Sequence, residues 1–180
     1  MKKSFSHVIL LILTIVIVVS CNDQASLQGY FVDHQESKNF LTQDIPISML
    51  KIDESKLSKE QKEAYNSVER LNFLGFKANE SNADTLATEL AKVKTILNSK
   101  KYNELLEFSD RGNKIVVKYI GDDTEAEEVI VFGSSKEMGF GIVRVLGHKM
   151  SPDKMATLAS VLQGANVNEG QLQDVMNFFK

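Results

Sequence analysis

Four short apolar runs in the C-terminal half, separated by turn-forming residues, constrain the fold of this chain more than any other feature. They cover residues 102–108, 114–120, 128–133 and 139–146, and the breaks between them contain Gly, Asp, Asn and Ser. Runs of this length bounded by such breaks are typical of strands, and short breaks connect antiparallel neighbours. The sequence therefore predicts a four-stranded antiparallel meander.

Helical and extended patterns alternate before and after this meander. Apolar residues recur every three or four positions from Leu86 to Leu97, which is the period of a helix face. Ser58 followed by Gln61 fits a capping box at a helix start, and Pro46 ends an extended run because it cannot donate to a ladder. The predicted elements are a short helix from Leu27 to His34, strands at 39–45 and 71–77, and helices at 59–69 and 86–97, from Pro152 onward, and after Gly164.

The order of these segments indicates an α+β fold. We expect a mostly antiparallel sheet, made of the C-terminal meander and one or two earlier strands, with the helices packed on one side. A domain of this size buries close to 70% of the surface that its unfolded chain exposes, so its core can stabilise it without disulfide bonds. We therefore expect a single domain over residues 27–180.

The only cysteine, Cys21, directly follows an apolar run at residues 8–19 that is preceded by Lys2 and Lys3. The run is shorter than the roughly 20 residues of a membrane-spanning helix and matches the layout of a secretory signal. Its exit at residues 18–21 resembles the bacterial lipoprotein box. That resemblance implies removal of residues 1–20 by cleavage between Ser20 and Cys21, with a diacylglyceryl group on the thiol and often an acyl group on the new amino terminus.

Residues 21–26 then form a lipidated cysteine and a short polar tether. Two or three acyl chains suffice for stable anchoring, because each buried methylene contributes about 0.8 kcal/mol. We expect a membrane-anchored envelope protein, with the outer membrane and a periplasmic orientation favoured; an uncleaved signal anchor and a secreted protein are the alternatives. The chain beyond the leader has 19 basic and 24 acidic side chains, which disfavours nucleic acid as a partner.

Four segments carry a resemblance to a known family: Phe40-Leu41 leading to Asp44-Ile45-Pro46, then residues 71–76, 102–105 and 142–150. Their order resembles an uncharacterised envelope lipoprotein family of the Bacteroidetes, catalogued as domain of unknown function 4252. The likeness covers roughly residues 27–162. It implies an α+β lipoprotein of unknown activity and supplies no catalytic residues.

No catalytic or cofactor motif is present in the sequence. There is no phosphate-binding glycine loop, nucleophile elbow or His-Glu-x-x-His pattern, so we expect no catalytic residue, no cofactor, no metal site and no enzymatic activity. Beyond the leader, His34 and His148 are the only histidines, and we interpret each as a surface or hydrogen-bonded residue. The acidic run at 122–128 lacks the glycine of a calcium loop, and we interpret it as a solvated turn.

Two function classes remain open. The first is a non-catalytic binding or interaction module whose partner is an unidentified envelope protein, with a role in envelope signalling. The alternative is a carrier of a lipid or other apolar ligand in a cavity between sheet and helices. Lys118 and Arg144 interrupt strand faces that are otherwise apolar. Either one face of the sheet is partly accessible to water, or the aliphatic parts of these two side chains extend to the edge of the sheet. The aromatic residues expected to point inward, as core or as cavity lining, are Phe73, Phe76, Phe108, Phe132 and Phe140.

Overall fold

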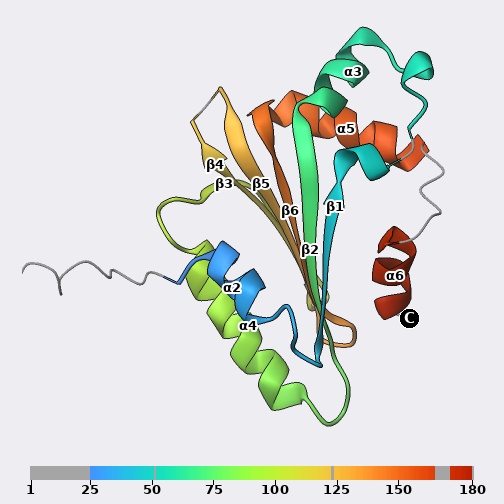
Figure 1. The fold of residues 1–180 in the computed structure, drawn as a ribbon. Coiled ribbons are helices and arrows are strands. Elements are labelled where there is room, and N and C mark those ends of the chain that lie inside the picture. The colour runs from blue at the N-terminus through green and yellow to red at the C-terminus, as the bar shows by residue number, and fades with distance from the viewer. Residues whose placement is uncertain (1–24, 51, 123, 165–170, 180) are drawn as a thin grey trace, which may run out of the picture.

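A six-stranded antiparallel sheet forms the central layer of the described part of the molecule (Figure 1). The computed structural model describes residues 25–50, 52–122, 124–164 and 171–179. The strands are β1 (Phe40–Pro46), β2 (Val68–Lys77), β3 (Asn103–Asp110), β4 (Asn113–Gly121), β5 (Ala126–Ser135) and β6 (Gly139–Met150).

The strand order is β1-β2-β6-β5-β4-β3, and each neighbouring pair is antiparallel. The predicted four-stranded meander is confirmed, since β3, β4, β5 and β6 pair consecutively. Both earlier strands join the same sheet, because β2 pairs with β6 and β1 pairs with β2. The last two strands are longer than predicted: β5 already begins at Ala126, and β6 continues to Met150.

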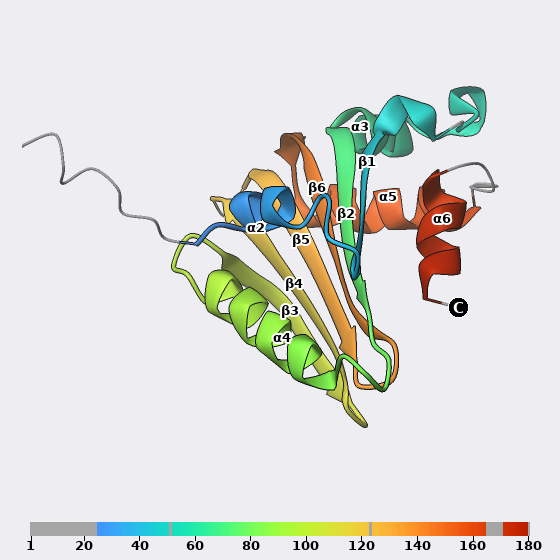
Figure 2. The same cartoon turned by 60° about the horizontal axis from the view of Figure 1, so that its bottom comes forward.

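Helices cover both faces of the sheet (Figures 1 and 2). They are α2 (Leu27–Asp33), α3 (Lys59–Asn66), α4 (Ala83–Leu97), α5 (Pro152–Gly164) and α6 (Gln171–Phe178), with 3-10 turns η2 (Ile47–Met49) and η3 (Glu54–Lys56). We call the face under α2 and α4 the inner face, and the face under α3, α5 and α6 the outer face. The expectation that helices pack on one side is wrong. Successive residues of a strand point to opposite faces, and β6 has Ile142 on the inner face and Val143 on the outer, so both faces require cover.

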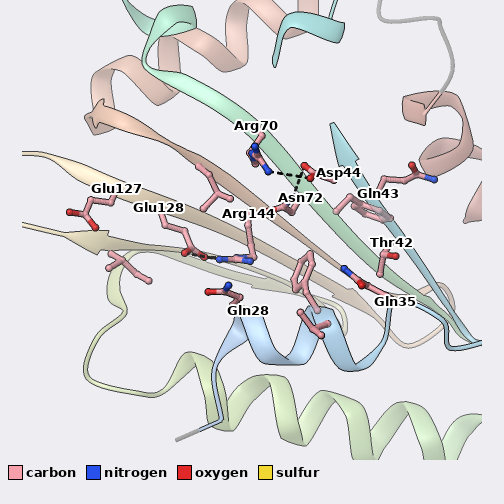
Figure 3. Close-up of a pocket in the computed structure, with 15 residues that line it drawn as sticks. Gln28, Gln35, Thr42, Gln43, Asp44, Arg70, Asn72, Glu127, Glu128 and Arg144 are labelled. Carbon is pink, nitrogen blue, oxygen red and sulfur yellow. Dashed lines mark hydrogen bonds and ion pairs between the residues drawn. The ribbon is translucent and has the colours of Figure 1, made fainter. Parts of the chain in front are cut away.

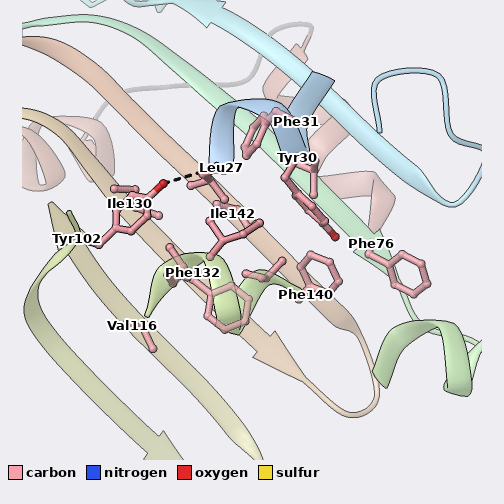
Figure 4. Close-up of a cluster of buried hydrophobic side chains, with 14 of the residues drawn as sticks. Leu27, Tyr30, Phe31, Phe76, Tyr102, Val116, Ile130, Phe132, Phe140 and Ile142 are labelled. Carbon is pink, nitrogen blue, oxygen red and sulfur yellow. Dashed lines mark hydrogen bonds between the residues drawn. The ribbon is translucent and has the colours of Figure 1, made fainter. Parts of the chain in front are cut away.

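Stacked aromatic rings form the centre of the inner core (Figure 4). The rings of Phe76 and Phe140 stack with centroids 5.6 Å apart, and Phe40 meets Phe76 edge-on at 5.0 Å. Leu27 of α2 and Val93 of α4 are completely buried in the same cluster. Each such side chain stabilises the fold by about 1.5–3 kcal/mol. The space at this end of the inner face is therefore filled by side chains, whereas a pocket of about 240 Å³ remains between α4 and strands β3 to β5.

A second core lies on the outer face beneath α3 and α5. Ala64 of α3, Leu158 of α5 and Val145 of β6 are buried together there. The predicted capping box opens α3: the Ser58 hydroxyl accepts from the Gln61 backbone N–H, and the Gln61 side chain accepts from the Ser58 N–H. This satisfies two backbone donors that have no partner within the helix.

Of the five phenylalanines expected to point inward, only Phe108 is exposed. Phe73, Phe76, Phe132 and Phe140 are buried, whereas Phe108 is 57% exposed on β3. β3 is the last strand of the sheet, and every one of its residues is exposed. The expectation is wrong for Phe108 because no helix of the described residues covers the outer face at this edge.

The helices thus cover opposite ends of the two faces (Figure 2). On the inner face, α2 and α4 lie over the end that holds Phe76 and Phe140, and the other end is polar at Asp44 and Asn72. On the outer face, α3 and α5 lie over the end that holds Val145. The inner face is therefore open at its polar end, whereas the outer face is open at its other end only over β3 to β5, because α6 covers β1 and β2 there.

Candidate functional site

The open end of the inner face carries a polar pocket of about 690 Å³ (Figure 3). β1, β2, β5 and β6 supply its floor, and α2 forms one wall. Strand pairing aligns Asp44, Asn72 and Arg144 in one row across β1, β2 and β6. In the next row, Arg70 of β2 and Glu128 of β5 lie on either side of β6. The sheet register therefore gathers charged side chains that are distant in sequence.

Arg144 and Glu128 form a buried ion pair at the base of this pocket. The Arg144 Nε and Nη2 atoms donate to Glu128 Oε1 and Oε2 at 2.7 and 3.0 Å. The two residues are only 7% and 9% exposed, and the guanidinium carbon lies 5.4 Å from the centre of the Phe31 ring. Such a two-pronged contact fixes the orientation of both groups. Arg144 is thus paired inside the protein and does not extend to the edge of the sheet.

Nearer the mouth of the pocket, two side chains converge on the carboxylate of Asp44 (Figure 3). Asn72 Nδ2 donates to Asp44 Oδ1 at 2.8 Å, and Arg70 Nη1 donates to Asp44 Oδ2 at 3.3 Å. The side chains of Arg70 and Asp44 are each about half exposed. Among the described residues, the Nε and Nη2 groups of Arg70 have no protein acceptor, so both can donate to a ligand.

The remaining polar lining is rich in amides. Gln28 and Gln35 come from α2, and Gln43 comes from β1. Primary amides offer both donors and acceptors. No Lys, His, Cys or Ser is among the lining residues, so the pocket presents no activated nucleophile with an adjacent base. The arrangement can hold a polar ligand through hydrogen bonds at several points.

The sequence analysis singled out Arg144 but none of its pocket neighbours. Asn72 shares the inner face of β2 with the buried residues Leu74 and Phe76, so the signal that marked Arg144 and Lys118 would also have found Asn72. On β1, Thr42 lies between Phe40 and Asp44 on the same face, so this signal does not mark Asp44. Lys118 lies on β4, where its Nζ approaches Glu104 Oε2 at 3.5 Å.

A second polar cluster joins α2 to α4 around the carboxylate of Glu89. The Tyr30 hydroxyl donates to Glu89 Oε2 at 2.7 Å, and Lys92 Nζ donates to Oε1 at 2.7 Å. His34 Nδ1 lies 2.7 Å from the Tyr30 carbonyl oxygen, and its Nε2 lies 3.4 Å from Glu89 Oε2. The predicted hydrogen-bonded character of His34 is therefore confirmed, and its partners tie the two inner-face helices together.

The electrostatics of this cluster follow from burial and hydrogen bonding. Burial by itself raises the pKa of Glu89, but the hydrogen bonds from Lys92 and Tyr30 outweigh it and hold that pKa below its ordinary value. Burial also raises the pKa of the Tyr30 phenol, and the hydrogen bond to Glu89 and the charge of its carboxylate raise it further. The ionised carboxylate and the neutral phenol are thus the stable forms.

The other residues considered in the sequence lie apart from the pocket. His148 is largely exposed at the end of β6, with its Nε2 3.0 Å from Glu69 Oε1. The described residues contain no group of three side chains suited to hold a metal ion. The predicted lipidation residue Cys21 and the cleavage site after Ser20 lie outside the described residues.

The acidic run at 122–128 divides into a turn and a strand. Asp122 Oδ1 accepts from the hydroxyl and backbone N–H of Thr124 and from the backbone N–H of Glu125. These hydrogen bonds hold the pKa of Asp122 below its usual range, first through the Thr124 hydroxyl. The solvated-turn interpretation therefore fits the start of the run. It is wrong for Glu128, which lies in β5 and pairs with Arg144.

Comparison with known proteins supplies the family. A family model described as "Domain of unknown function (DUF4252)" matches residues 30–158. The chain belongs to this family. The DUF4252 match begins within α2 and ends within α5, so it includes the whole sheet and most of the pocket lining. No curated protein and no solved structure matches the chain. Among the described helices, none has the length and apolar character to cross a membrane.

Proposed function

We propose that this DUF4252 protein is a non-catalytic binding module, anchored to the cell envelope through acyl chains on Cys21, that binds a polar segment of another envelope protein. The pocket at the open end of the inner face is the proposed binding site. A role in envelope signalling belongs to the same proposal. The observation that carries it is the buried Arg144–Glu128 pair at the base of an open polar pocket.

The placement of this pair supports binding better than stability. β5 and β6 lie inside the sheet, where apolar side chains at the same positions would extend the inner core. A buried ion pair is often no more stabilising than apolar residues of similar volume. Departures from a locally favourable pattern are expected at functional sites. We therefore assign the polar end of the inner face to ligand recognition.

The chemistry of the lining favours a peptide-like ligand. The polar lining combines two arginines, three acidic side chains, four carboxamides and one hydroxyl, so it offers both donors and acceptors; these residues are Arg70, Arg144, Asp44, Glu127, Glu128, Gln28, Gln35, Gln43, Asn72 and Thr42. A polypeptide backbone offers donors and acceptors in equal number. An extended polar segment of a protein therefore matches the pocket better than a purely anionic or purely apolar ligand.

The carrier of an apolar ligand is less well supported by the geometry. The space between the inner face and α2 and α4 is occupied by packed aromatic side chains, including the stacked pair Phe76 and Phe140. Packing of this kind leaves no room for a lipid chain around the stacked rings. The pocket of about 240 Å³ between α4 and strands β3 to β5 has charged residues among its lining, namely Lys94, Glu104, Glu107, Lys114 and Lys118. We keep the carrier as an outcome of the binding experiment.

The anchor is tested by cell fractionation. We expect Cys21→Ala to leave the domain folded and to move it from the membrane fraction to the soluble fraction, because both cores are made by residues that follow Cys21 in the sequence. Metabolic labelling with a fatty acid should mark the unaltered chain and not the variant. Equal membrane retention of both chains would contradict the anchoring proposal.

The pocket is tested by site-specific photo-crosslinking in cells. A photo-reactive amino acid placed at Gln28, an exposed wall residue, should capture a recurrent envelope protein that mass spectrometry identifies. The matched control carries the same group at Lys59, an exposed residue at the start of α3. Adding Arg70→Ala to the Gln28 probe should abolish the capture, because it removes a donor at the mouth.

Three results would decide between the proposals. Capture at Gln28 that depends on Arg70 supports the binding module. Capture that is equal at Gln28 and Lys59, or indifferent to Arg70→Ala, contradicts the assignment of the pocket. A stoichiometric lipid in the purified protein, without a protein partner, replaces the module by the carrier.

A further inference from the structure

A row of three glycines crosses the outer face of the sheet. Gly75 of β2 is opposite Gly141 of β6, which is opposite Gly133 of β5. Because direct cross-strand partners point to the same side, the missing side chains fall on one line. The outer face is therefore hollowed along this row.

One half of the row is already filled by aromatic side chains of the same chain. A Cβ atom at Gly75 would lie 2.8 Å from the Phe73 ring and 3.0 Å from the Phe178 ring. A Cβ atom at Gly141 would lie 3.4 Å from Phe73 and 3.6 Å from Phe179. Phe178 and Phe179 belong to α6 and its end, so the hollow accepts aromatic rings.

The other half of the row is open. No atom lies within 4 Å of the position that a Cβ atom would take at Gly133. The row continues to Ile115 of β4 and Phe108 of β3, which are 45% and 57% exposed. Leu106 and Val131 in the adjacent row are 54% and 36% exposed. A hollow and a protruding ring thus occur side by side on one apolar surface.

This surface carries no charge in either row. The adjacent row reads Leu106, Val117, Val131 and Val143 across four strands. Of the acidic residues of β3, Glu107 points to the inner face and binds Lys114 at 2.8 Å, whereas Asp110 shares the outer face with Phe108 at the rim of the patch, with its Oδ1 3.9 Å from Arg111 Nε. An uncharged patch of large apolar side chains marks a protein contact.

We propose that this surface is the contact between two copies of the chain, with Phe108 of each copy inserted in the hollow at Gly133 of the other. Phe108 cannot fill the hollow of its own chain, because Ile115 lies between them. Strands are about 4.8 Å apart, so Phe108 and Gly133 are separated by about 10 Å. A twofold axis beside Ile115 places Phe108 of each copy opposite Gly133 of the other. Both contacts then form together, as an isologous interface requires.

Face-to-face packing is favoured over edge-to-edge pairing of two β3 strands. The register of β3 is interrupted by a bulge between Glu104 and Leu106, which breaks the free edge. Edge pairing would also bring the acidic residues of two β3 strands together, and like charges opposite one another are destabilising. In the face-to-face contact Glu104 and Glu107 stay on the inner side of each sheet, and Asp110 lies at the rim of the contact.

The size of the patch agrees with the core of a small dimer interface. The exposed parts of Leu106, Phe108, Ile115 and Val131 amount to roughly 400 Å², since a whole large side chain presents about 150–250 Å². A standard interface buries about 800 Å² on each partner, with an apolar centre and a polar rim. The residues around the patch supply that rim.

Cysteine crosslinking of the full chain tests this contact. Ile115→Cys places two thiols beside the proposed axis, and a mild oxidant applied to intact cells should produce a disulfide-linked dimer on a non-reducing gel. The control is Met49→Cys, an apolar position on η2 that is 61% exposed and thus more accessible than Ile115. The parent chain reports any crosslinking through Cys21 itself.

Two second-site changes make the result specific. Gly133→Leu begins to fill the hollow with a Cβ atom that has no other atom within 4 Å, and Phe108→Ser removes an exposed ring, so we expect both variants to keep the fold. Each should reduce the Ile115→Cys crosslink at least fivefold, while the melting temperature stays near that of the parent. Crosslinking no stronger than that of Met49→Cys, or crosslinking that survives both changes, would overturn the proposal.

Discussion

Removal of one member of the Arg144–Glu128 pair is expected to destabilise the protein strongly, whereas removal of both is not. Arg144→Met leaves the Glu128 carboxylate 9% exposed and without its two charged donors. Loss of one partner of a buried pair costs about 3–5 kcal/mol. For a domain of this size, that lowers the melting temperature by roughly 10 °C. Glu128→Leu is expected to have a similar effect, because it leaves the buried Arg144 guanidinium without its carboxylate partner.

The double variant Arg144→Met with Glu128→Leu should recover most of this loss. It places two apolar side chains next to Ile142 and Ile130, which already belong to the inner core. Replacing a buried pair by apolar residues is often neutral or stabilising by about 1–4 kcal/mol. Urea unfolding followed by circular dichroism yields all four free energies and their coupling.

Two outcomes would refute this reasoning. If each single change costs under about 1 kcal/mol, the pair is hydrated through the pocket, because exposed ion pairs contribute that little. If the double variant loses the sum of the two single costs, the charges stabilise the fold independently. If the double variant is stable but the photo-reactive group at Gln28 no longer captures the partner protein, the ion pair is needed for binding and not for folding.

Three further predictions concern the scaffold. Hydrogen bonds lower the pKa of Glu89 below 4.5 in the folded protein, so the ionised carboxylate stabilises the fold fully above pH 4.5, and this contribution disappears as the pH falls through the lower folded pKa. The urea midpoint should therefore fall more steeply with acidification in the parent protein than in Glu89→Gln. Parallel curves for the two proteins would contradict this prediction. Gly139 has φ +104°, and a Cβ atom there would overlap the carbonyl oxygen of Phe76. Gly139→Ala should therefore lower the free energy of unfolding, measured in urea, by more than about 1 kcal/mol, whereas Gly133→Ala should change it by no more than about 0.5 kcal/mol. Equal losses in the two variants would contradict this prediction. Ser58→Ala removes the capping box of α3 and should cost about 1 kcal/mol, which thermal unfolding would detect, whereas an unchanged melting temperature would show that the cap is dispensable.

The meander was predictable because its signals are local. Gly112 and Gly121 adopt positive φ angles at the ends of β4, where turns require residues without a side chain. The breaks in the sequence therefore coincide with the breaks between strands. The capping box at Ser58 was predictable for the same reason, since both of its hydrogen bonds connect residues three positions apart.

The coverage of the sheet was mispredicted although the signal was present. β6 alternates between two sets of apolar residues, with Phe140 and Ile142 on one face and Val143 and Val145 on the other. Such a strand is buried on both sides and needs helices on both. The expectation of helices on one side followed from the order of the elements and did not use this alternation along β6.

The pocket could not be assembled from the sequence, because it depends on register. Glu128 is a diagonal neighbour of Arg144, whose direct partner is Ile130, in a register that runs without a shift from Ser135 opposite Gly139 to Glu128 opposite Leu146. A shift by one residue would move Glu128 to the outer face. Asp44 meets Asn72 only because β1 pairs with β2, which no local pattern in either strand specifies.

The position of β6 between β2 and β5 has a consequence for the order in which the chain can fold. β1 and β2 can pair as soon as they are synthesised, and β3, β4 and β5 can form their own three-stranded unit. The two units share no strand pairing until β6 enters between them, where Leu74 meets Ile142 and Val131 meets Val143. The pairing of β2 with β6 joins residues that are distant in sequence, and such pairings form slowly. The sheet therefore becomes continuous only after residue 150 has left the ribosome, and a chain that ends before Gly139 holds two separate sheets with open edges.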